Sequence, residues 1–280
     1  MAEVYTINHN KRRSFFGSFR VNTILIALNV IFFIIFTILI SVNEKFIAIN
    51  PSSIFAGQYL WTFLTSMFMH AGFAHLFFNM FSLFFIGTVV ERIIGRKRYL
   101  WFYLVSGIFA GLFFVTLSFY FGNSEIGARI FGDPNVLGVG ASGAIFGLVG
   151  LLAVLIPYSK VYLILGPLIA IIADSLITSI PALAPIKSVL SVLISVYLFV
   201  SIFAIFSFSD RFRKIAVPVG MPFWLLPLVA IIPLIIIGLF VSLPIGNTAH
   251  LGGFLVGIFY GIYLRTKYKK KTSMLSKYFS

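Results

Sequence analysis

The stretch "LGVGASGAIFGL", residues 137–148, is the part of the chain from which fold and function are best inferred. It consists of small and apolar residues around a single hydroxyl group, that of Ser142. Small residues allow helices to pack backbone against backbone within a membrane. They would also clear space around a serine that has to reach a reactant. The stretch therefore predicts a membrane helix that either packs closely or presents a reactive serine at its start.

The composition of the whole chain predicts an all-α polytopic membrane protein. Of its 280 residues, 60% are hydrophobic and only 10% are charged, whereas soluble domains are about 25% charged. The absence of cysteine excludes disulfides and thiolate metal sites, and we expect neither a metal nor a cofactor. The formal net charge is +14, but the basic residues cluster beside apolar runs as orienting charges do, which argues against nucleic acid as a partner.

The apolar runs define the expected spans, since a helix needs about 20 such residues to cross a bilayer. Clear runs lie at 22–42, 73–91, 99–121, 141–157, 186–208, 223–243 and 248–264. A weaker run at 161–180 contains Pro167 and Asp174. Lys160 is expected inside and the start of the run 248–264 outside, so the chain between them must cross the membrane an odd number of times. Since 186–208 and 223–243 both look like spans, 161–180 should cross as well, which predicts eight spans. The alternative is that 161–180 lies at the interface and a later segment crosses incompletely.

The basic flanks predict the orientation of these spans. Placing them all in the cytoplasm puts residues 1–20 and the basic tail 266–280 inside, on either side of a transmembrane domain at 21–265. Residues 43–72, 122–140 and 244–247 then lie outside, and the aromatic segment around Trp61 is expected at the membrane interface. The first run is too long for a cleaved signal peptide. We expect a prokaryotic plasma membrane, and the tail "RTKYKKK" is an inside anchor that could also attract anionic lipid.

Histidines within apolar segments are candidates for function, because polar groups in spans are costly. The segment "MHAGFAHLFFNM" holds His70, His75 and Asn79, of which the last two share one helix face. One interpretation is that His75 and Asn79 only satisfy each other or a neighbouring helix. The segment "GNTAHLGGFLVGIFYG" places His250 before Gly253 and Gly257, whose spacing is typical of helix packing.

Depth in the membrane brings these residues together. At about 1.5 Å per residue, Ser142, Asn79 and His250 lie roughly 27, 20 and 22 Å from the basic residue that ends each span. All three therefore fall in the outer part of a hydrocarbon core about 30 Å thick. His75, one turn from Asn79, falls there too.

Nucleophilic catalysis is the chemistry that fits this set. A serine needs a base, which His250 can supply, and the free N–H groups at the start of the helix of Ser142 favour an oxyanion. Asn79 and His75 can add side-chain donors. Gly140 and Gly143 would let a substrate backbone approach. No acidic residue has a suitable position, so we expect a Ser–His dyad and not a triad.

These motifs resemble those of the rhomboid family of intramembrane serine proteases. The GxSG motif of the family corresponds to Gly140-Ala141-Ser142-Gly143, and its histidine-glycine motif to Ala249-His250 with Gly253 and Gly257. Its second-helix pattern corresponds to His70, His75 and Asn79. The resemblance covers roughly residues 20–160 and 244–265. Many members carry Trp-Arg where this chain has Trp61-Thr62, and residues 161–243 are longer than one span needs.

The resemblance implies a six-helix core, here with two extra spans, and a role for each residue. Ser142 would be the nucleophile and His250 the base, with Asn79, His75 and the Ser142 amide binding the oxyanion. Phe146 would stack on the histidine, and Glu91 would be a structural acid.

The implied reaction is hydrolysis of a peptide bond in or near a transmembrane helix of a substrate membrane protein, at a site that opens to the outside. Gly or Pro in the substrate would help its helix to unwind. The alternatives are an inactive relative that binds or escorts membrane proteins, and a channel or transporter that uses the polar residues as an ion path.

Overall fold

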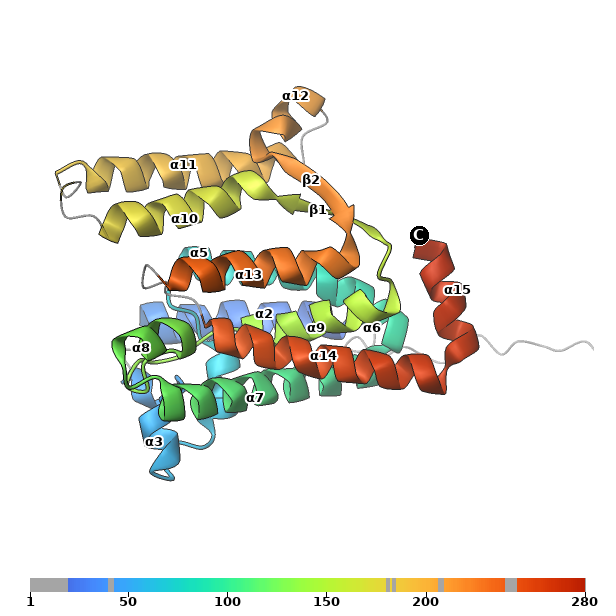
Figure 1. The fold of residues 1–280 in the computed structure, drawn as a ribbon, viewed down its shortest axis with the longest axis horizontal. Coiled ribbons are helices and arrows are strands. Elements are labelled where there is room, and N and C mark those ends of the chain that lie inside the picture. The colour runs from blue at the N-terminus through green and yellow to red at the C-terminus, as the bar shows by residue number, and fades with distance from the viewer. Residues whose placement is uncertain are drawn as a thin grey trace, which may run out of the picture.

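The computed structural model describes residues 20–39, 43–179, 182, 185–205, 209–239 and 246–279. Nearly all of its elements are helices, which form a bundle of roughly parallel rods with a hairpin of two further helices beside it (Figure 1). The bundle contains α2 (Val21–Phe33), α5 (Phe73–Ser82), α6 (Thr88–Ile94), α7 (Arg96–Phe121), α9 (Ser142–Leu155), α13 (Leu226–Gly238) and α14 (Asn247–Lys267). The π-helical segments η1 (Ile34–Leu39) and η4 (Leu83–Gly87) continue α2 and join α5 to α6.

Helix α9 is the centre of the bundle. It packs against α14 and α7, and the side chains of Leu148, Leu151 and Leu152 are almost wholly buried. The contact with α14 is made by glycines: a Cβ added to Gly257 would lie 2.7 Å from the backbone nitrogen of Leu151. Such backbone-to-backbone contact is what small residues permit in a membrane bundle.

One end of the bundle carries the connections between helices. Residues 43–72 form short helical segments, η2 (Glu44–Phe46), α3 (Pro51–Phe55), α4 (Thr62–Thr65) and η3 (Ser66–Phe68), of which α3 and α4 pack on α7. Ile49 forms an isolated bridge with Gly138. Helix α8 (Glu125–Phe131) completes this end. Trp61 is 55% exposed, and its Nε1 donates a hydrogen bond to the carbonyl of Phe46; its position at a membrane interface stays a prediction.

Glu91 ties α6 to the start of α2. Its carboxylate accepts hydrogen bonds from the backbone nitrogens of Val21 (2.9 Å) and Asn22 (3.0 Å). The first N–H groups of a helix have no partner within the helix, so the negative charge of Glu91 satisfies two of them and opposes the helix dipole.

Residues 160–222 differ from the expected arrangement. Strand β1 (Lys160–Ile164) pairs antiparallel with β2 (Pro218–Pro222), with Lys160 opposite Pro222. The prediction of one helical run over 161–180 was therefore wrong at its start, because residues 161–164 are extended and α10 spans Leu165–Ser179. Helix α11 (Lys187–Ile205) packs along α10, and Ser191 Oγ donates to Asp174 Oδ1 at 2.6 Å.

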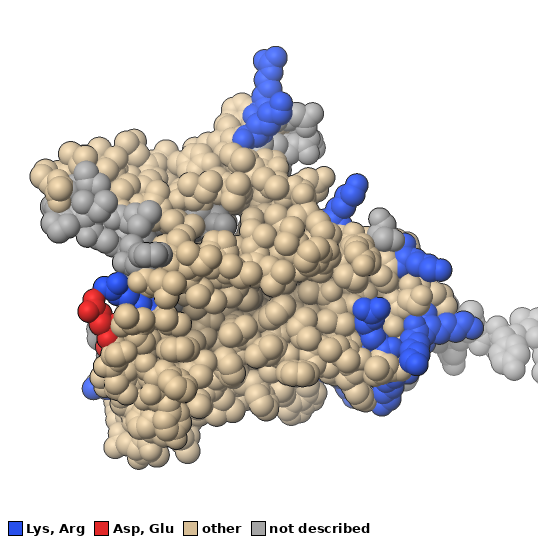
Figure 2. All heavy atoms as spheres, in the orientation of Figure 1, with Lys and Arg blue, Asp and Glu red and all other residues tan. Residues whose placement is uncertain are grey.

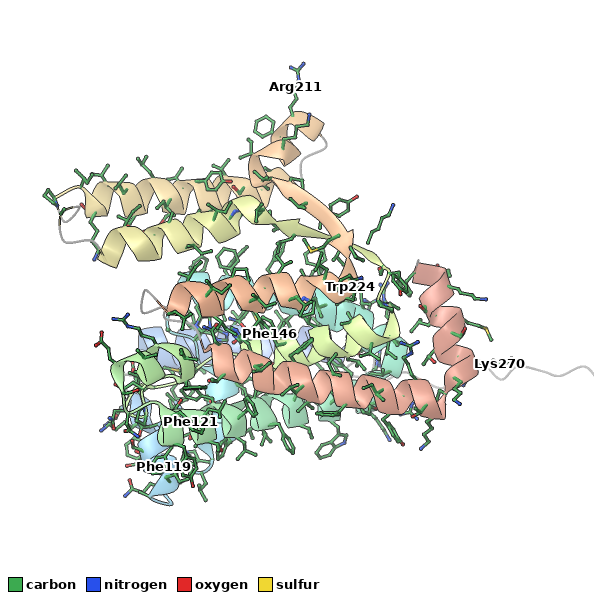
Figure 3. The ribbon with its side chains drawn as sticks, viewed as in Figure 1. Phe119, Phe121, Phe146, Arg211, Trp224 and Lys270 are labelled. Atoms are coloured by element: carbon green, nitrogen blue, oxygen red, sulfur yellow. The ribbon has the colours of Figure 1, made fainter. Side chains whose placement is uncertain are left out.

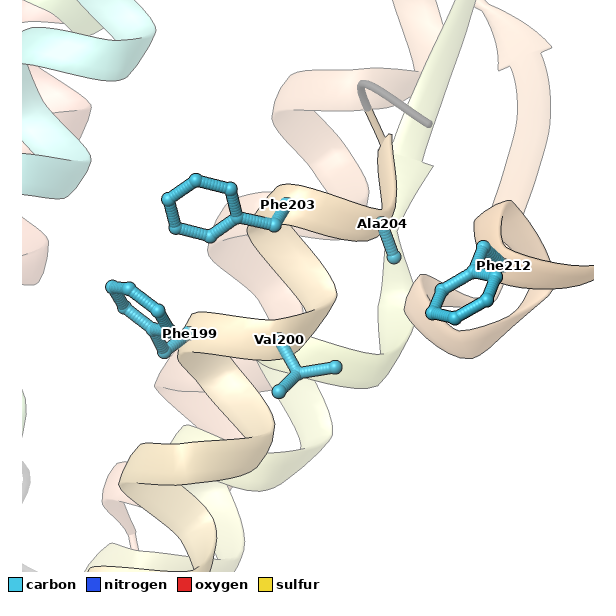
Figure 4. Close-up of a pocket in the computed structure, with 5 residues that line it drawn as sticks. All are labelled: Phe199, Val200, Phe203, Ala204 and Phe212. Atoms are coloured by element: carbon cyan, nitrogen blue, oxygen red, sulfur yellow. The ribbon is translucent and has the colours of Figure 1, made fainter. Parts of the chain in front are cut away.

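The elements that follow α11 return the chain to the bundle. They are α12 (Asp210–Arg213), η6 (Lys214–Ala216), the strand β2 and η7 (Phe223–Leu225), which leads into α13. An apolar hollow of about 280 Å³ lies between α11 and α12 and is lined by Phe199, Val200, Phe203, Ala204 and Phe212 (Figure 4). It offers no polar group for chemistry.

Length and hydropathy identify membrane helices only in part. Among the described residues, 2 helices are long and apolar enough to cross a bilayer, Phe73–Ile94 and Arg96–Phe121. Shorter apolar helices cover Val21–Phe36, Ser142–Leu155, Leu165–Asp174, Lys187–Ser201 and Phe223–Gly238. The count of eight spans stays a prediction.

Charge is unevenly distributed over the surface. Lys and Arg gather at the end of the bundle where α14 meets the terminal helix α15 (Lys269–Phe279), and the remaining surface in that view is mostly uncharged (Figure 2).

Candidate active site

Ser142 is the first residue of α9, as the sequence predicts. The loop before it is fixed by a hydrogen bond from the Gly140 nitrogen to the Ser66 carbonyl (2.9 Å). Gly140 has φ +124°, a conformation that side chains other than glycine rarely adopt. The turn therefore places the serine hydroxyl next to backbone N–H groups that have no acceptor within the helix.

His250 lies directly against this serine. Its Nε2 is 2.9 Å from Ser142 Oγ, although 108 residues separate the two in sequence. His250 belongs to the first turn and a half of α14, so the glycine contact between α9 and α14 holds the two side chains together. The depth argument from sequence predicted this proximity, and the distance is within ordinary hydrogen-bond range.

Phe146 fixes the orientation of the histidine ring. The two rings are stacked with centroids 4.3 Å apart and an interplanar angle of 17°. Phe146 lies one turn after Ser142 on α9, inside the bundle (Figure 3). The stack limits rotation of the imidazole about its side-chain bonds, so Nε2 stays directed at the hydroxyl. Among the residues that the structure describes, no Asp or Glu is paired with His250.

His75 approaches the same point from α5. Its Nδ1 accepts a hydrogen bond from the Ala71 nitrogen at 3.4 Å. An imidazole that accepts at Nδ1 carries its proton at Nε2 when neutral. A Cβ placed on Gly140 would be 2.9 Å from His75 Nε2 and 3.7 Å from Ser142 Oγ. The Nε2–H donor and the hydroxyl thus border the same small space, which the missing side chain of Gly140 leaves open.

Asn79 lies one turn below His75 and is buried, at 6% exposure. Its Nδ2 donates to the backbone carbonyl of His75 at 2.8 Å. The two side chains do not bond to each other, which differs from the simplest structural interpretation of their spacing. The Oδ1 atom has no hydrogen-bond partner among the described residues. The Nδ2 atom carries two hydrogens, and the bond to the His75 carbonyl uses one of them.

His70 is brought closer than its spacing from His75 suggests. The sequence places it off the face shared by His75 and Asn79, yet the chain turns between residues 69 and 72. The His70 ring meets the His75 ring edge to face, with centroids 5.1 Å apart. His70 is 1% exposed, and burial, followed by the neighbouring His75, lowers the pKa of His70 to about 3. His70 therefore packs behind the His75 ring as a buried, uncharged side chain.

The glycines near the serine have different surroundings. The expectation that Gly143 admits a substrate backbone was wrong, because a Cβ there would lie 2.5 Å from the Cβ of Ala110 in α7. Gly143 is thus a packing residue. Gly253 and Gly257 face the backbone of α9, in agreement with the packing interpretation of their spacing. Gly140 alone faces the space around Ser142.

Two backbone groups that support this arrangement were not found from the sequence. They are the carbonyl of Ser66 and the N–H of Ala71, which bind Gly140 and His75. Main-chain groups leave no residue signature, so no pattern in the sequence could have identified them.

Comparison with known proteins identifies the family to which the chain is similar. The Rhomboid domain matches residues 57–192 and 190–267. The putative rhomboid protease YdcA of Bacillus subtilis is 38% identical over 90 residues, 32% of this chain and 38% of YdcA. The rhomboid protease AarA of Providencia stuartii is 40% identical over 92 residues, 31% of each chain. Inactive RHOMBOID-like protein 8 of Arabidopsis thaliana is 38% identical over 73 residues, 26% of this chain and 21% of that protein.

The chain thus spans well under half the length of these relatives. The domain match nevertheless includes the elements that carry Ser142, His75, Asn79 and His250. The matched segments cover more than half of the chain. The chain therefore belongs to the rhomboid family of integral membrane proteins.

Proposed function

We propose that the chain is an intramembrane serine endopeptidase that hydrolyses peptide bonds in or near the transmembrane helices of substrate membrane proteins. The observation that carries the proposal is the 2.9 Å contact between Ser142 Oγ and His250 Nε2. A serine bonded to an imidazole is the arrangement that makes a weak nucleophile reactive.

In the proposed reaction Ser142 Oγ attacks the scissile carbonyl carbon while its proton passes to His250 Nε2. The histidine then gives this proton to the leaving amine as the C–N bond breaks, which leaves an ester on Ser142. A water molecule, deprotonated by His250, attacks the ester, and the proton returns to Ser142 as the acid product departs. Phe146 supports both transfers because its stack holds the ring in place.

The oxyanion of each tetrahedral intermediate would be bound by the Ser142 N–H, His75 and Asn79. Three features support this assignment: the helix start at Ser142, the proton on His75 Nε2 beside Gly140, and the second hydrogen of Asn79 Nδ2. Donors fixed before the reaction stabilise the developing charge without reorganising.

We also propose the orientation that the charges favour. The basic end of the bundle would face the cytoplasm, with both tails (1–20 and 266–280), and Ser142 would open to the outside of a prokaryotic plasma membrane. The gathering of Lys and Arg at the α14–α15 end supports this (Figure 2). The transmembrane domain would then cover 21–265 in eight spans, and the partners would be substrate membrane proteins and the bilayer, without nucleic acid.

The second candidate is an inactive relative that binds or escorts membrane proteins. It is favoured by the match to Inactive RHOMBOID-like protein 8. The intact Ser142–His250 contact favours the protease.

The test is cleavage of a single-span substrate, with glycine in the outer half of its helix, by the full chain in liposomes. Wild type is compared with Ser142→Ala, His250→Ala and Ser106→Ala, the last a control that removes another buried helix hydroxyl. We expect cleavage by wild type and Ser106→Ala alone, and fluorophosphonate labelling of the same two proteins. Cleavage by Ser142→Ala would refute the mechanism, and wild type that neither cleaves nor is labelled would favour the escort.

A further inference from the structure

The end of the bundle opposite Ser142 holds a cluster of cations that the proposed reaction does not use. The first turn of α7 contributes Arg98, the last turn of α14 contributes Lys267, and both lie over the same ring, that of Tyr268. Arg98 Cζ is 5.7 Å and Lys267 Nζ is 5.8 Å from the ring centroid. Two cations are therefore held beside one aromatic side chain.

Among the residues that the structure describes, this cluster has little negative charge nearby. Glu91 is the one acid in the sequences of α6, α7, α14 and α15. It is 5% exposed and accepts the two N–H groups that start α2. Arg98 and Lys267 are both exposed. Like charges at close range repel each other, so a bound anion would relieve the repulsion.

Helix α15 forms the edge of this cluster. It does not continue the direction of α14 but runs across the end of the bundle and contacts α9 (Figure 1). Leu275 and Phe279 pack on the main core, while Met274 and Tyr278 are 58% and 84% exposed. Lys269, Lys270 and Lys271, at its start, add three exposed cations next to Tyr268 (Figure 3 labels Lys270).

A helix with basic residues and exposed aromatic or thioether side chains, lying across the ends of membrane helices, is suited to the interface of a bilayer. Orienting charges alone would not need such a helix or a shared aromatic ring between two helix ends. Phosphate is the anion that both a guanidinium and an ammonium bind well, and at this depth its source is a lipid headgroup.

We infer that Arg98, Lys267 and the start of α15 form a binding site for the headgroups of anionic phospholipids, at the membrane surface opposite Ser142. The site is independent of proteolysis, since none of these residues contacts the serine or its neighbours. The cations bind the phosphate, and the exposed Met274 and Tyr278 rest among the adjoining acyl chains.

The test measures the preference of the full chain for spin-labelled phosphatidylglycerol over spin-labelled phosphatidylcholine in phosphatidylcholine bilayers. Removing one cation should lower anionic lipid binding about fivefold at low salt. We therefore expect Arg98→Gln/Lys267→Gln to lose the preference at least fivefold. The matched control is Arg211→Gln/Lys214→Gln, which removes one exposed charge in α12 and one at the start of η6, apart from the cluster (Figure 3 labels Arg211), and should keep the preference.

Three further arms make the result decisive. The charge-conserving variant Arg98→Lys/Lys267→Arg should keep the preference, and unchanged thermal unfolding of each variant shows that the fold is intact. Inorganic phosphate at 10 mM should not abolish the preference. A loss below fivefold, an equal loss in the control, or displacement by free phosphate would overturn the proposal.

Discussion

Gly257→Ala tests the contact on which the whole site depends. The added Cβ would lie 2.7 Å from the Leu151 nitrogen and 2.9 Å from the Gly150 Cα, and closer still to the Gly147 carbonyl. These are backbone atoms of α9, so no side chain can rotate away, and carbon atoms in contact sit about 3.5–4.0 Å apart. Helices α9 and α14 must therefore separate by roughly 1 Å at this crossing.

The expected cost has a structural and a chemical part. Overpacking of a tight contact destabilises by about 1–3 kcal/mol, which lowers the midpoint of thermal unfolding. Gly257 is about two turns from His250 on α14, so the separation also lengthens the 2.9 Å contact with Ser142. A displacement of about 1 Å at a reacting pair can reduce the rate by about a hundredfold. The assays are thermal unfolding in detergent and the rate of fluorophosphonate labelling.

Gly246→Ala is the matched control, because it precedes the same helix and its Cβ would be 3.6 Å from that of Ala249, an ordinary contact. It should unfold and react like wild type. If Gly257→Ala also kept both the unfolding midpoint and the labelling rate, the close approach of α9 and α14 would be refuted, whatever the natural substrate is.

Three other substitutions probe separate features. Gly140→Ala forces a side chain into φ +124° and 2.9 Å from a neighbouring imidazole nitrogen, so labelling should slow about tenfold or more; an unchanged rate would mean that this loop adapts. Glu91→Gln removes charge from two helix-start hydrogen bonds and should lower the free energy of unfolding by about 1–3 kcal/mol, whereas an unaltered denaturation curve would contradict the capping role. Ser191→Ala breaks the bond to Asp174 and should speed hydrogen exchange in α10 and α11, while Ser195→Ala, whose hydroxyl bonds only within its own helix, should not; equal exchange in both would remove the significance of that bond.

The sequence predicted the elements that carry the site better than the finer contacts. The helix start at Ser142 and its approach to His250 follow from apolar runs, basic flanks and the rise per residue, all of which are local quantities. Local quantities do not predict that Gly140 faces the active site while Gly143 packs on α7. Which of the two glycines faces α7 depends on how whole helices are rotated.

The region after α9 was predicted less well for the same reason. The run 161–180 is mostly apolar, apart from Pro167 and Asp174, and hydropathy alone does not show that its first residues are extended. Their pairing with residues 218–222 is a non-local contact. Hydropathy reports what a segment can bury and not which distant segment it meets.

The antiparallel ribbon has a consequence for the construction of the chain. Directly opposed residues of such a pair lie about 4.5–5.5 Å apart, so the chain leaves the bundle at Lys160 and returns beside it at Pro222. Everything between, including α10 and α11, is a lateral insertion with adjoining ends, and such insertions are well tolerated by a host fold. A short turn from 159 to 223 would close the same gap, so we expect that the segment can be lengthened, exchanged or excised while the helices that hold the serine and the histidine keep their places, although Val161 packs against their core.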